Sequence, residues 1–541
     1  MEKRKFDWRR LWPLLFFGLC LLRFCYYGCT YLPLLDDSIQ YHNYAFFGDG
    51  LWAEVERMSL LGARPLAGIL DIGFWSLFFE HLFWAIVLIT ALFTGAAFFF
   101  ERAFAKAFGC SPLFYALLLL TPVNFEGTYW LSASTRVVVG MFFAGLSVYL
   151  FSRYAESGKA RYIPLFAMAG LAACGFYEQT LVLSVAGVLL LGIFYWKKLR
   201  ARALFALLTL ANAGIYFGFT GFFKSTGIYA ERSGGTILPF ASNFYNTKVW
   251  PALLEQLKGA FVDAPAAITG RGFVRGAQLL FEGPNVIWIL AAVALLALLG
   301  FALLWRRGRA EPAPVRPAVW GIVVGALLAL APIAPFLILD NPWVSLRSVC
   351  CSLVGAALVA DRAVALLLRP VPVRRGVTAG LTLALSAFFL VGSISELSDY
   401  RQTGEDDRRI VDGILAAIGD ERPEEDWESS IVVLGLRPSY LEEQNYAHNE
   451  HIHGVTESDW ALYGALLCRS EDIGTPTALP VPFGDVTAKL PQIENGYLYL
   501  FADERGEISR VRRRGERFYS EQGEPVAALV TEGERTTLVA Q

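Results

Sequence analysis

Apolar stretches long enough to cross a lipid bilayer recur along the chain as far as residue 395 and then stop. A membrane-spanning helix needs roughly 20 mostly apolar residues. The pattern therefore predicts about eleven spanning helices, at residues 11–30, 74–100, 112–131, 135–151, 162–177, 179–196, 203–223, 285–305, 318–339, 345–368 and 376–394. The third and fourth stretches, and likewise the fifth and sixth, are also compatible with re-entrant hairpins.

The remainder of the chain, residues 396–541, has the pattern of a polar folded domain. Helical periodicity covers 406–418 and 458–468, and short apolar runs at 430–436, 497–502 and 527–530 are typical of strands. We predict a mainly α-helical transmembrane domain over 1–395 and a small α/β domain over 396–541. The arginine-rich run 510–514 is expected to be an exposed turn or strand edge, with contact to anionic headgroups or polymer as the alternative.

Lysine and arginine alternate between the two sides of the predicted spans. If the N-terminus is cytoplasmic, every inner segment is basic and the short outer segments carry few cations, as the positive-inside rule requires. An odd number of spans then places the C-terminal domain on the extracytoplasmic side of the plasma or inner membrane, with two long outer segments at 31–73 and 224–284. The inner basic residues are Lys3, Arg4, Lys5, Arg9, Arg10, Arg102, Lys106, Arg153, Lys159, Arg161, Lys197, Lys198, Arg200, Arg202, Arg306, Arg307, Arg309, Arg369, Arg374 and Arg375.

Composition agrees with a membrane protein. Of the 541 residues, 55% are hydrophobic and only 18% are charged, whereas a soluble protein is about one-quarter charged. The net charge of -2 gives no basic signal for nucleic acid, which we exclude as a partner, and membrane lipids are the expected surroundings. The eight cysteines are interpreted as free thiols rather than a disulfide framework.

Two adjacent carboxylates, Asp36 and Asp37, follow the first predicted span. One could accept a proton from an acceptor hydroxyl, while the other holds a divalent cation such as Mg²⁺ or Mn²⁺, orients the first, or raises its pKa by like-charge repulsion. His42 lies in the same segment and could orient a substrate. Alternatively, the aspartates are turn or capping residues and the histidine is a solvated loop residue.

Three arginines are expected on the same outer side. Arg64 lies within Gly62-Ala63-Arg64-Pro65-Leu66, and Arg136 and Arg347 open the fourth and tenth predicted spans. Converging arginines can clamp a phosphate group, on which negative charge develops as it leaves a sugar. The alternative is that each arginine extends separately toward lipid headgroups.

Two glutamates occupy the outer ends of the short hairpins. Glu126 and Glu178 could pair with an arginine of the clamp or contact sugar hydroxyls, or they could be ordinary interfacial carboxylates. Trp130 could stack on a sugar face, but the sequence favours a place in the interfacial aromatic belt.

These features together resemble the glycosyltransferase-C (GT-C) superfamily, which includes protein O-mannosyltransferases, lipid A aminoarabinose transferases and bacterial Gtr-type glucosyltransferases. The resemblance is carried by the first span followed at once by Leu35-Asp36-Asp37, by Gly62-Ala63-Arg64-Pro65-Leu66, and by Asn341-Pro342-Trp343-Val344-Ser345-Leu346-Arg347. It covers residues 1–395 and is most similar to the multi-span, Gtr-like branch. It implies that Asp36 or Asp37 is the catalytic base and that Arg347 contacts the donor phosphate.

The expected activity is therefore that of a membrane hexosyltransferase. It would move sugar, with inversion, from a polyprenyl-phosphate carrier to a glycan, lipid or protein acceptor on the outer face, in the biogenesis of cell-envelope polysaccharide or a related glycan. A flippase or transporter for a lipid-linked sugar, and a polysaccharide ligase or polymerase, remain alternatives, because both also need outer arginines.

The C-terminal domain holds three of the five histidines within six residues, at His448, His451 and His453. They could bind a transition metal or contact a sugar, but no HExxH motif or paired cysteine accompanies them. A plain polar loop is therefore the favoured interpretation, and the sequence assigns no metal.

Overall fold

The computed structural model describes residues 11–43, 50–57, 60–223, 247, 249–305, 314–339, 341–419, 431–437, 453–472 and 474–541. Within these limits the chain divides into two compact units. The first unit comprises residues 11–30 and 50–397, and the second comprises residues 31–43 and 398–541. The segment with Asp36, Asp37 and His42 therefore belongs to the same compact unit as the C-terminal part of the chain.

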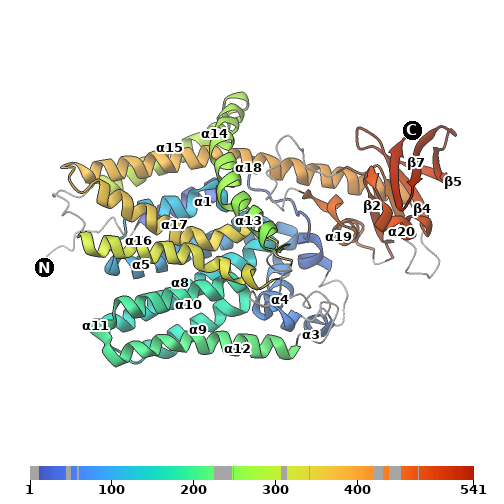
Figure 1. Cartoon of the computed structure of the whole chain (residues 1–541). Coiled ribbons are helices and arrows are strands. Elements are labelled where there is room, and N and C mark those ends of the chain that lie inside the picture. The colour runs from blue at the N-terminus through green and yellow to red at the C-terminus, as the bar shows by residue number, and fades with distance from the viewer. Residues whose placement is uncertain are drawn as a thin grey trace. The chain divides into compact units, whose positions relative to one another are not determined.

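The first unit is built from helices (Figure 1). Among the described residues, seven helical segments that lie wholly or partly in this unit are long and apolar enough to cross a membrane: Trp75–Ala107, Leu131–Ser157, Trp196–Phe223, Val286–Leu304, Val315–Ile338, Leu346–Leu367 and Arg374–Ile418. The last of them continues past residue 397 into the second unit. Three shorter apolar helices are α1 (Trp12–Leu22), α9 (Tyr162–Phe176) and α10 (Glu178–Phe194). These ten segments fall on ten of the eleven predicted spans. They fit a membrane protein, and none of them covers 112–131.

Within these segments, the longer elements are α5 (Leu82–Ala107), α8 (Leu131–Ser157), α12 (Leu208–Phe223), α15 (Val286–Leu304), α16 (Val315–Leu330), α17 (Leu346–Leu367) and α18 (Arg374–Ile418). The shorter ones are α3 (Leu51–Arg57), α4 (Pro65–Gly73), α6 (Leu113–Tyr115), α7 (Phe125–Tyr129), α11 (Trp196–Leu199), α13 (Trp250–Lys258) and α14 (Ala264–Glu282). Separate helices were predicted over 376–394 and 406–418, but α18 runs through both without a break. No proline lies within this range to interrupt it.

The segment between α5 and α8 differs from its prediction. The two helices run in the same direction, because Gly95 faces Phe142 near their middles and Lys106 pairs with Glu156 near their ends. The chain must therefore return along the bundle between them. It does so through α6, a π-helical turn at Ala116–Leu120, a 3-10 turn at Pro122–Asn124 and α7. The prediction of one continuous helix over 112–131 is wrong, because Thr121 is extended and Pro122 cannot donate a backbone hydrogen bond.

Buried side chains satisfy the backbone of this interrupted pass. Arg23, which has no exposed surface, donates from Nη1 to Thr121 O at 3.2 Å and to Asn124 Oδ1 at 2.7 Å. Its Nη2 donates to Thr128 Oγ1 at 2.7 Å, and Asn124 Nδ2 donates to Leu118 O at 2.6 Å. Irregular backbone at membrane depth is tolerated only where protein or a cavity satisfies it. Sequence analysis gave Arg23 no role, although it was the only charged residue within the first predicted span.

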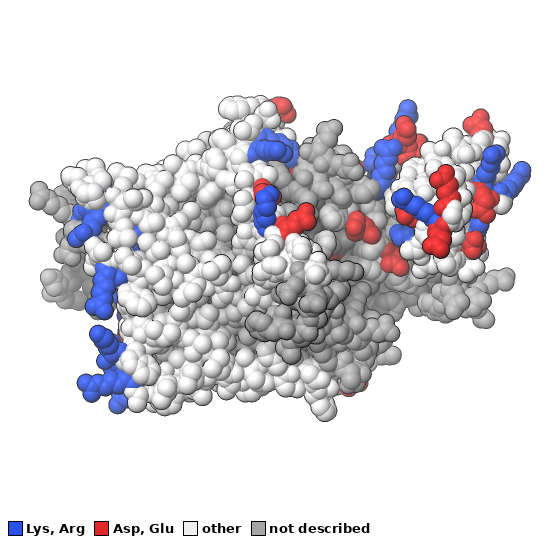
Figure 2. Space-filling model, in the orientation of Figure 1, with Lys and Arg blue, Asp and Glu red and all other residues white. Residues whose placement is uncertain are grey.

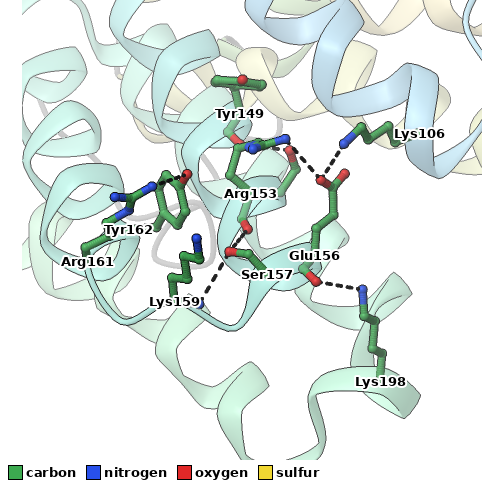
Figure 3. Close-up of polar contacts among 10 residues, drawn as sticks. Lys106, Tyr149, Arg153, Glu156, Ser157, Lys159, Arg161, Tyr162 and Lys198 are labelled. Carbon is green, nitrogen blue, oxygen red and sulfur yellow. Dashed lines mark hydrogen bonds and ion pairs between the residues drawn. The ribbon is translucent and has the colours of Figure 1, made fainter.

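Basic side chains gather at one end of the first unit, where Figure 2 shows blue atoms beside an otherwise white helical surface. Figure 3 shows Glu156 between Lys106 and Arg153, with its Oε2 at 2.6 Å from Lys106 Nζ and 3.5 Å from Arg153 Nη1. Lys198 Nζ donates to Glu156 O at 3.3 Å, which brings α11 to the same end. These are residues that sequence analysis assigned to the inner side. The basic N-terminus and Arg306 to Arg309 lie outside the described residues.

Gly276 allows α14 to pack closely on α18. A Cβ atom on Gly276 would lie 2.1 Å from Val391 O, and beside it Phe273 stacks on Phe388 with ring centroids 4.4 Å apart. Because the nearest atom is backbone, an added methyl group would force the helices apart. Gly270 lies on the same helix with nothing within 4 Å of its Cβ position.

We therefore expect Gly276→Ala to lower the free energy of unfolding by about 1–3 kcal/mol through overpacking. The matched change Gly270→Ala should be neutral or stabilising by roughly 0.5–1 kcal/mol, because alanine favours a helix. Thermal unfolding of both variants in the same detergent measures the difference. Equal unfolding midpoints would contradict the close packing of α14 on α18.

The second unit has a mixed sheet in the order β2-β1-β4-β5-β6-β7-β8-β3. Its strands are β1 (Ile431–Leu434), β2 (Ala478–Val481), β3 (Gly484–Asp485), β4 (Leu498–Ala502), β5 (Ile508–Arg514), β6 (Arg517–Ser520), β7 (Pro525–Glu532) and β8 (Arg535–Ala540). β1 pairs in parallel with β2 and β4, and the other pairs are antiparallel. With helices α19 (Asp459–Ser470) and α20 (Leu490–Glu494), the unit is α/β. The predicted strands near 430–436, 497–502 and 527–530 and the helix near 458–468 are confirmed.

The arginine-rich run lies in β5, which pairs with β4 on one side and β6 on the other. The prediction of a turn or strand edge is therefore wrong. Arg510 donates to the last carbonyls of α18, from Nε to Ala417 O at 2.5 Å and from Nη2 to Ile418 O at 2.9 Å. A cation at a helix C-terminus complements the helix dipole and satisfies carbonyls that have no partner within the helix. Arg510 is thus a structural residue of the second unit.

Candidate functional site

An arginine cluster lies in the first unit, where α4 and the N-terminal ends of α8, α10 and α17 supply its residues. Arg64 directly precedes Pro65, the first residue of α4, and its Nε lies 3.1 and 3.2 Å from the two carboxylate oxygens of Glu178. Its guanidinium stands 4.4 Å from the ring centroid of Tyr177. Glu178 begins α10 because Tyr177 before it is extended and separates α9 from α10. The predicted pairing of Glu178 with an arginine is therefore observed.

The mode of this pairing leaves most of the Arg64 guanidinium available. Both contacts with Glu178 use Nε, and among the described residues no hydrogen bond reaches Nη1 or Nη2. The side chains of Arg64 and Glu178 are 33% and 34% exposed, so part of this ion pair is open to solvent. A guanidinium fixed at one edge keeps a second edge with the fork geometry that matches two phosphate oxygens.

Arg136 is held by a carboxylate that sequence analysis missed. Its Nη2 lies 3.2 Å from Oδ2 of Asp71, and Thr135 Oγ1 donates to Asp71 Oδ1 at 3.1 Å. Burial raises the pKa of the Asp71 carboxyl, and the charge of Arg136 opposes that rise. The sequence feature that could have identified Asp71 is its position as the one acidic residue within the apolar run Pro65–Gly73. The charge of Arg64 also acts on Asp71, so Arg64 and Arg136 lie in one electrostatic neighbourhood.

Arg347 lies in the first turn of α17, 5.5 Å from the ring of Trp130. Trp130 is only 1% exposed, so its predicted place in the interfacial belt is wrong, and it packs inside the protein beneath a cation. The charges of both Arg347 and Arg64 act on the Tyr177 hydroxyl, which connects the two arginines through one aromatic residue. The structure thus brings Arg64, Arg136 and Arg347 into one part of the first unit.

Glu126 is buried in the short helix α7, and the next residue, Gly127, would meet the Arg347 Cα at 3.5 Å if it carried a Cβ. Glu126 therefore lies in the protein interior, in a helix that contacts α17, and the interpretation as an ordinary interfacial carboxylate is wrong. The interrupted pass supplies this position, because α7 follows directly after the break at Thr121 and Pro122.

The two aspartates belong to the second unit and differ in environment. Asp37 has no exposed surface, and its Oδ2 accepts from the Tyr31 hydroxyl at 2.5 Å and from Leu34 N at 3.2 Å. Asp36 is half-buried, and its Oδ2 accepts from Gln40 Nε2 at 3.1 Å. Asp37 thus closes the turn that presents Asp36. The turn interpretation holds for Asp37. Asp36 is the less buried residue of the two, although its Oδ1 is buried and its Oδ2 is engaged by Gln40.

His42 anchors the same segment through its neighbour. Its Nδ1 lies 3.0 Å from Asn43 Oδ1, and Asn43 Nδ2 donates to Gly464 O in α19 at 2.7 Å. Among the described residues no group of three or more His, Cys, Asp or Glu side chains forms a metal site. A divalent cation at Asp36 and Asp37 stays a prediction. His448 and His451 lie outside the described residues, and His453 Nδ1 is 3.8 Å from a carboxylate oxygen of Glu457.

A surface hollow of about 730 Å³ runs along α14, the amphipathic helix that follows α13. Asp263, Arg271, Val274, Arg275 and Gln278 are among its lining residues, so both charged and apolar groups face it. Arg275 Nη1 also donates to Ser395 Oγ of α18 at 3.2 Å, which fixes this side of the helix. This amphipathic helix lies within 224–284, one of the two long segments that the sequence predicts on the outer side.

The long apolar helices and the charges collected at helix ends are those of an α-helical membrane protein. Neither a protein-family model nor a curated protein sequence matches the chain.

Proposed function

We propose that the protein is a membrane glycosyltransferase that moves a hexose from a polyprenyl-phosphate carrier to a hydroxyl of a glycan, lipid or protein on the extracytoplasmic face. The observation that carries this proposal is the arginine cluster, and within it Arg64, whose partly exposed side chain meets Glu178 through Nε alone. Surface arginines that only neutralise lipid headgroups need no buried carboxylates such as Asp71 to hold them. Arginines that carboxylates fix in position can stabilise a phosphate whose negative charge increases in the transition state.

The reaction is a single displacement. The acceptor oxygen bonds to the anomeric carbon as the bond from that carbon to the phosphate oxygen breaks, with inversion. Asp36 takes the proton of the acceptor hydroxyl, since Asp36 is the less buried residue of the pair and its carboxylate accepts fewer of the hydrogen bonds that close the turn. Arg64, with Arg136 and Arg347, stabilises the phosphate that leaves. Asp37 is a positioning residue in this scheme, because its carboxylate is engaged in closing the turn.

Transport of a lipid-linked sugar is a second candidate, because two passes of the first unit are interrupted. One is the segment broken at Pro122, and the other ends in the 3-10 segment Ala331–Ile338, which contains Pro332 and Pro335. Both contact α17, since Gly127 faces Cys350 while Gln179 Nε2 bridges Pro332 O and Ser348 O at 2.9 Å each. Discontinuous helices often frame transport sites.

The experiment that separates these functions supplies proteoliposomes with a polyprenyl-phosphate hexose labelled in the sugar. A transferase releases free polyprenyl phosphate and passes the label to an acceptor. A transporter moves the intact labelled lipid between leaflets and leaves the bond between sugar and phosphate uncleaved. Cleavage that depends on the protein is the expected result, and translocation without cleavage would overturn the proposal.

A further inference from the structure

Two thiols face each other in the turn that follows α1. Cys25 Sγ and Cys29 Sγ are 3.9 Å apart, and both cysteines are free. Cys29 is exposed and Cys25 is half-buried, so one thiol of the pair is open to a reagent. The turn is closed by a hydrogen bond from Gly28 N to Cys25 O at 3.1 Å, and Gly28 has φ +105°, which glycine adopts without strain.

The flanks of this turn are fixed to the rest of the first unit. The Tyr26 hydroxyl donates to Gly283 O at 2.8 Å, and Asn285 Nδ2 donates to Tyr26 O at 2.7 Å. At the other end, the Tyr129 hydroxyl donates to Thr30 O at 3.4 Å. Because both sides of the turn are anchored, the sulfur atoms stay near one another instead of exploring the distances that a free loop would allow.

We propose that Cys25 and Cys29 are a disulfide-forming pair, oxidised by thiol–disulfide exchange with an external disulfide, either that of a small thiol or that of a thiol oxidoreductase. A protein disulfide needs a bond of about 2 Å between the sulfur atoms, which rotation of two facing side chains can provide here. The pair immediately precedes Tyr31, the first residue of the segment that carries Asp36 and Asp37. Its oxidation would close a covalent ring beside that segment.

The exchange has two steps. The Cys29 thiolate, the more exposed of the two, attacks one sulfur of the external disulfide and displaces a thiolate from the other sulfur. Cys25 then loses its proton and attacks the Cys29 sulfur of the mixed disulfide, which releases the second external thiol. In total, two cysteine thiols are oxidised, one external disulfide is reduced to two thiols, and the protons pass from the cysteines to those thiols.

The experiment exposes the full-length protein to oxidised glutathione, blocks the remaining thiols with a maleimide, and maps the peptides by mass spectrometry. The peptide that contains both cysteines should lose two hydrogen atoms and carry neither glutathione nor maleimide. This cross-linked form should exceed the doubly glutathionylated form by about tenfold or more, because a neighbouring thiol acts at a high effective concentration. In Cys25→Ser, the reaction should stop at a glutathione adduct on Cys29.

Cys468 provides the internal control, because it is half-buried and no sulfur contact is recorded for it among the described residues. It should gain a glutathione or maleimide adduct and no cross-link. Two separate glutathione adducts on Cys25 and Cys29, or two free thiols under conditions that modify Cys468, would overturn the proposal. This outcome is independent of the glycosyltransferase proposal, since it requires no sugar donor.

Discussion

Replacing Asp36 with asparagine should lower the rate of sugar transfer by roughly 10²–10⁴-fold, the usual contribution of a general base. Asparagine keeps the shape of the side chain and can still accept the hydrogen bond from Gln40 Nε2, so the turn should remain folded. What it loses is the ability to take a proton. The measurement is transfer of labelled sugar by equal amounts of folded wild-type protein and Asp36→Asn at saturating donor.

Asp37→Asn is the comparison that separates chemistry from structure. Asp37 is buried and its Oδ2 accepts from Tyr31 and Leu34, so the change should destabilise the protein by about 1–3 kcal/mol while leaving more activity than Asp36→Asn. Tyr31→Phe removes one of the same hydrogen bonds without altering the carboxylate. It should also destabilise the protein, but by less than Asp37→Asn does. If Asp37→Asn abolished transfer in folded protein and Asp36→Asn did not, the two roles would be exchanged.

The second large effect is expected at Arg64. Arg64→Ala removes the terminal nitrogens that take no part in the contact with Glu178 and should lower kcat/KM for the lipid-linked donor by about 10²-fold. Arg64→Lys should recover only part of this loss, because an ammonium group cannot hold two phosphate oxygens with a planar fork. Glu178→Gln should have a smaller effect, since it removes the negative charge beside Arg64 while the amide oxygen can still accept a hydrogen bond from Arg64 Nε.

Arg102→Ala is the matched control for that series. Arg102 also pairs with a carboxylate, Glu101, at 3.7 Å and is 48% exposed, but it lies in the C-terminal half of α5 near the basic end of the unit. Arg102→Ala should leave kcat/KM unchanged.

A binding measurement with two lipids tests the phosphate contact itself. Arg64→Ala should weaken the binding of polyprenyl phosphate and leave the binding of polyprenol, which lacks the phosphate, unchanged. An equal loss with both lipids would indicate damaged packing and not a lost phosphate contact.

The sequence predicted the helices that follow from the length and apolar composition of a stretch. Ten apolar stretches became helical segments because apolar composition persists along each of them, although three are shorter and one ends in a 3-10 segment with Pro332 and Pro335. The eleventh, 112–131, is equally apolar, but Pro122 and the hydrogen bonds that Arg23 makes to Thr121 O and Asn124 convert it into an interrupted pass. Those bonds join residues about 100 positions apart in the chain, and apolar periodicity carries no information on them.

The sequence predicted the side of the membrane for the candidate site residues, but not the long-range contacts that hold them. Alternation of basic segments assigned Arg64, Arg136, Arg347, Glu126 and Glu178 to one side, and the structure gathers them within the first unit. Asp71 was missed, because its role appears only when α4 meets α8. The sequence also did not reveal that the Asp36 segment packs with the C-terminal unit, a grouping that depends on the contact of Asn43 with Gly464.

The most direct test of the account is whether the purified protein cleaves the bond between sugar and phosphate in a polyprenyl-phosphate hexose. A panel of donors, labelled in the sugar, is offered to proteoliposomes that contain wild-type protein and an extract of cell-envelope acceptors. We expect free polyprenyl phosphate and labelled acceptor to appear together for one donor, and both to be lost in Asp36→Asn. Movement of intact donor across the bilayer without cleavage, or equal cleavage by wild type and Asp36→Asn, would contradict the account.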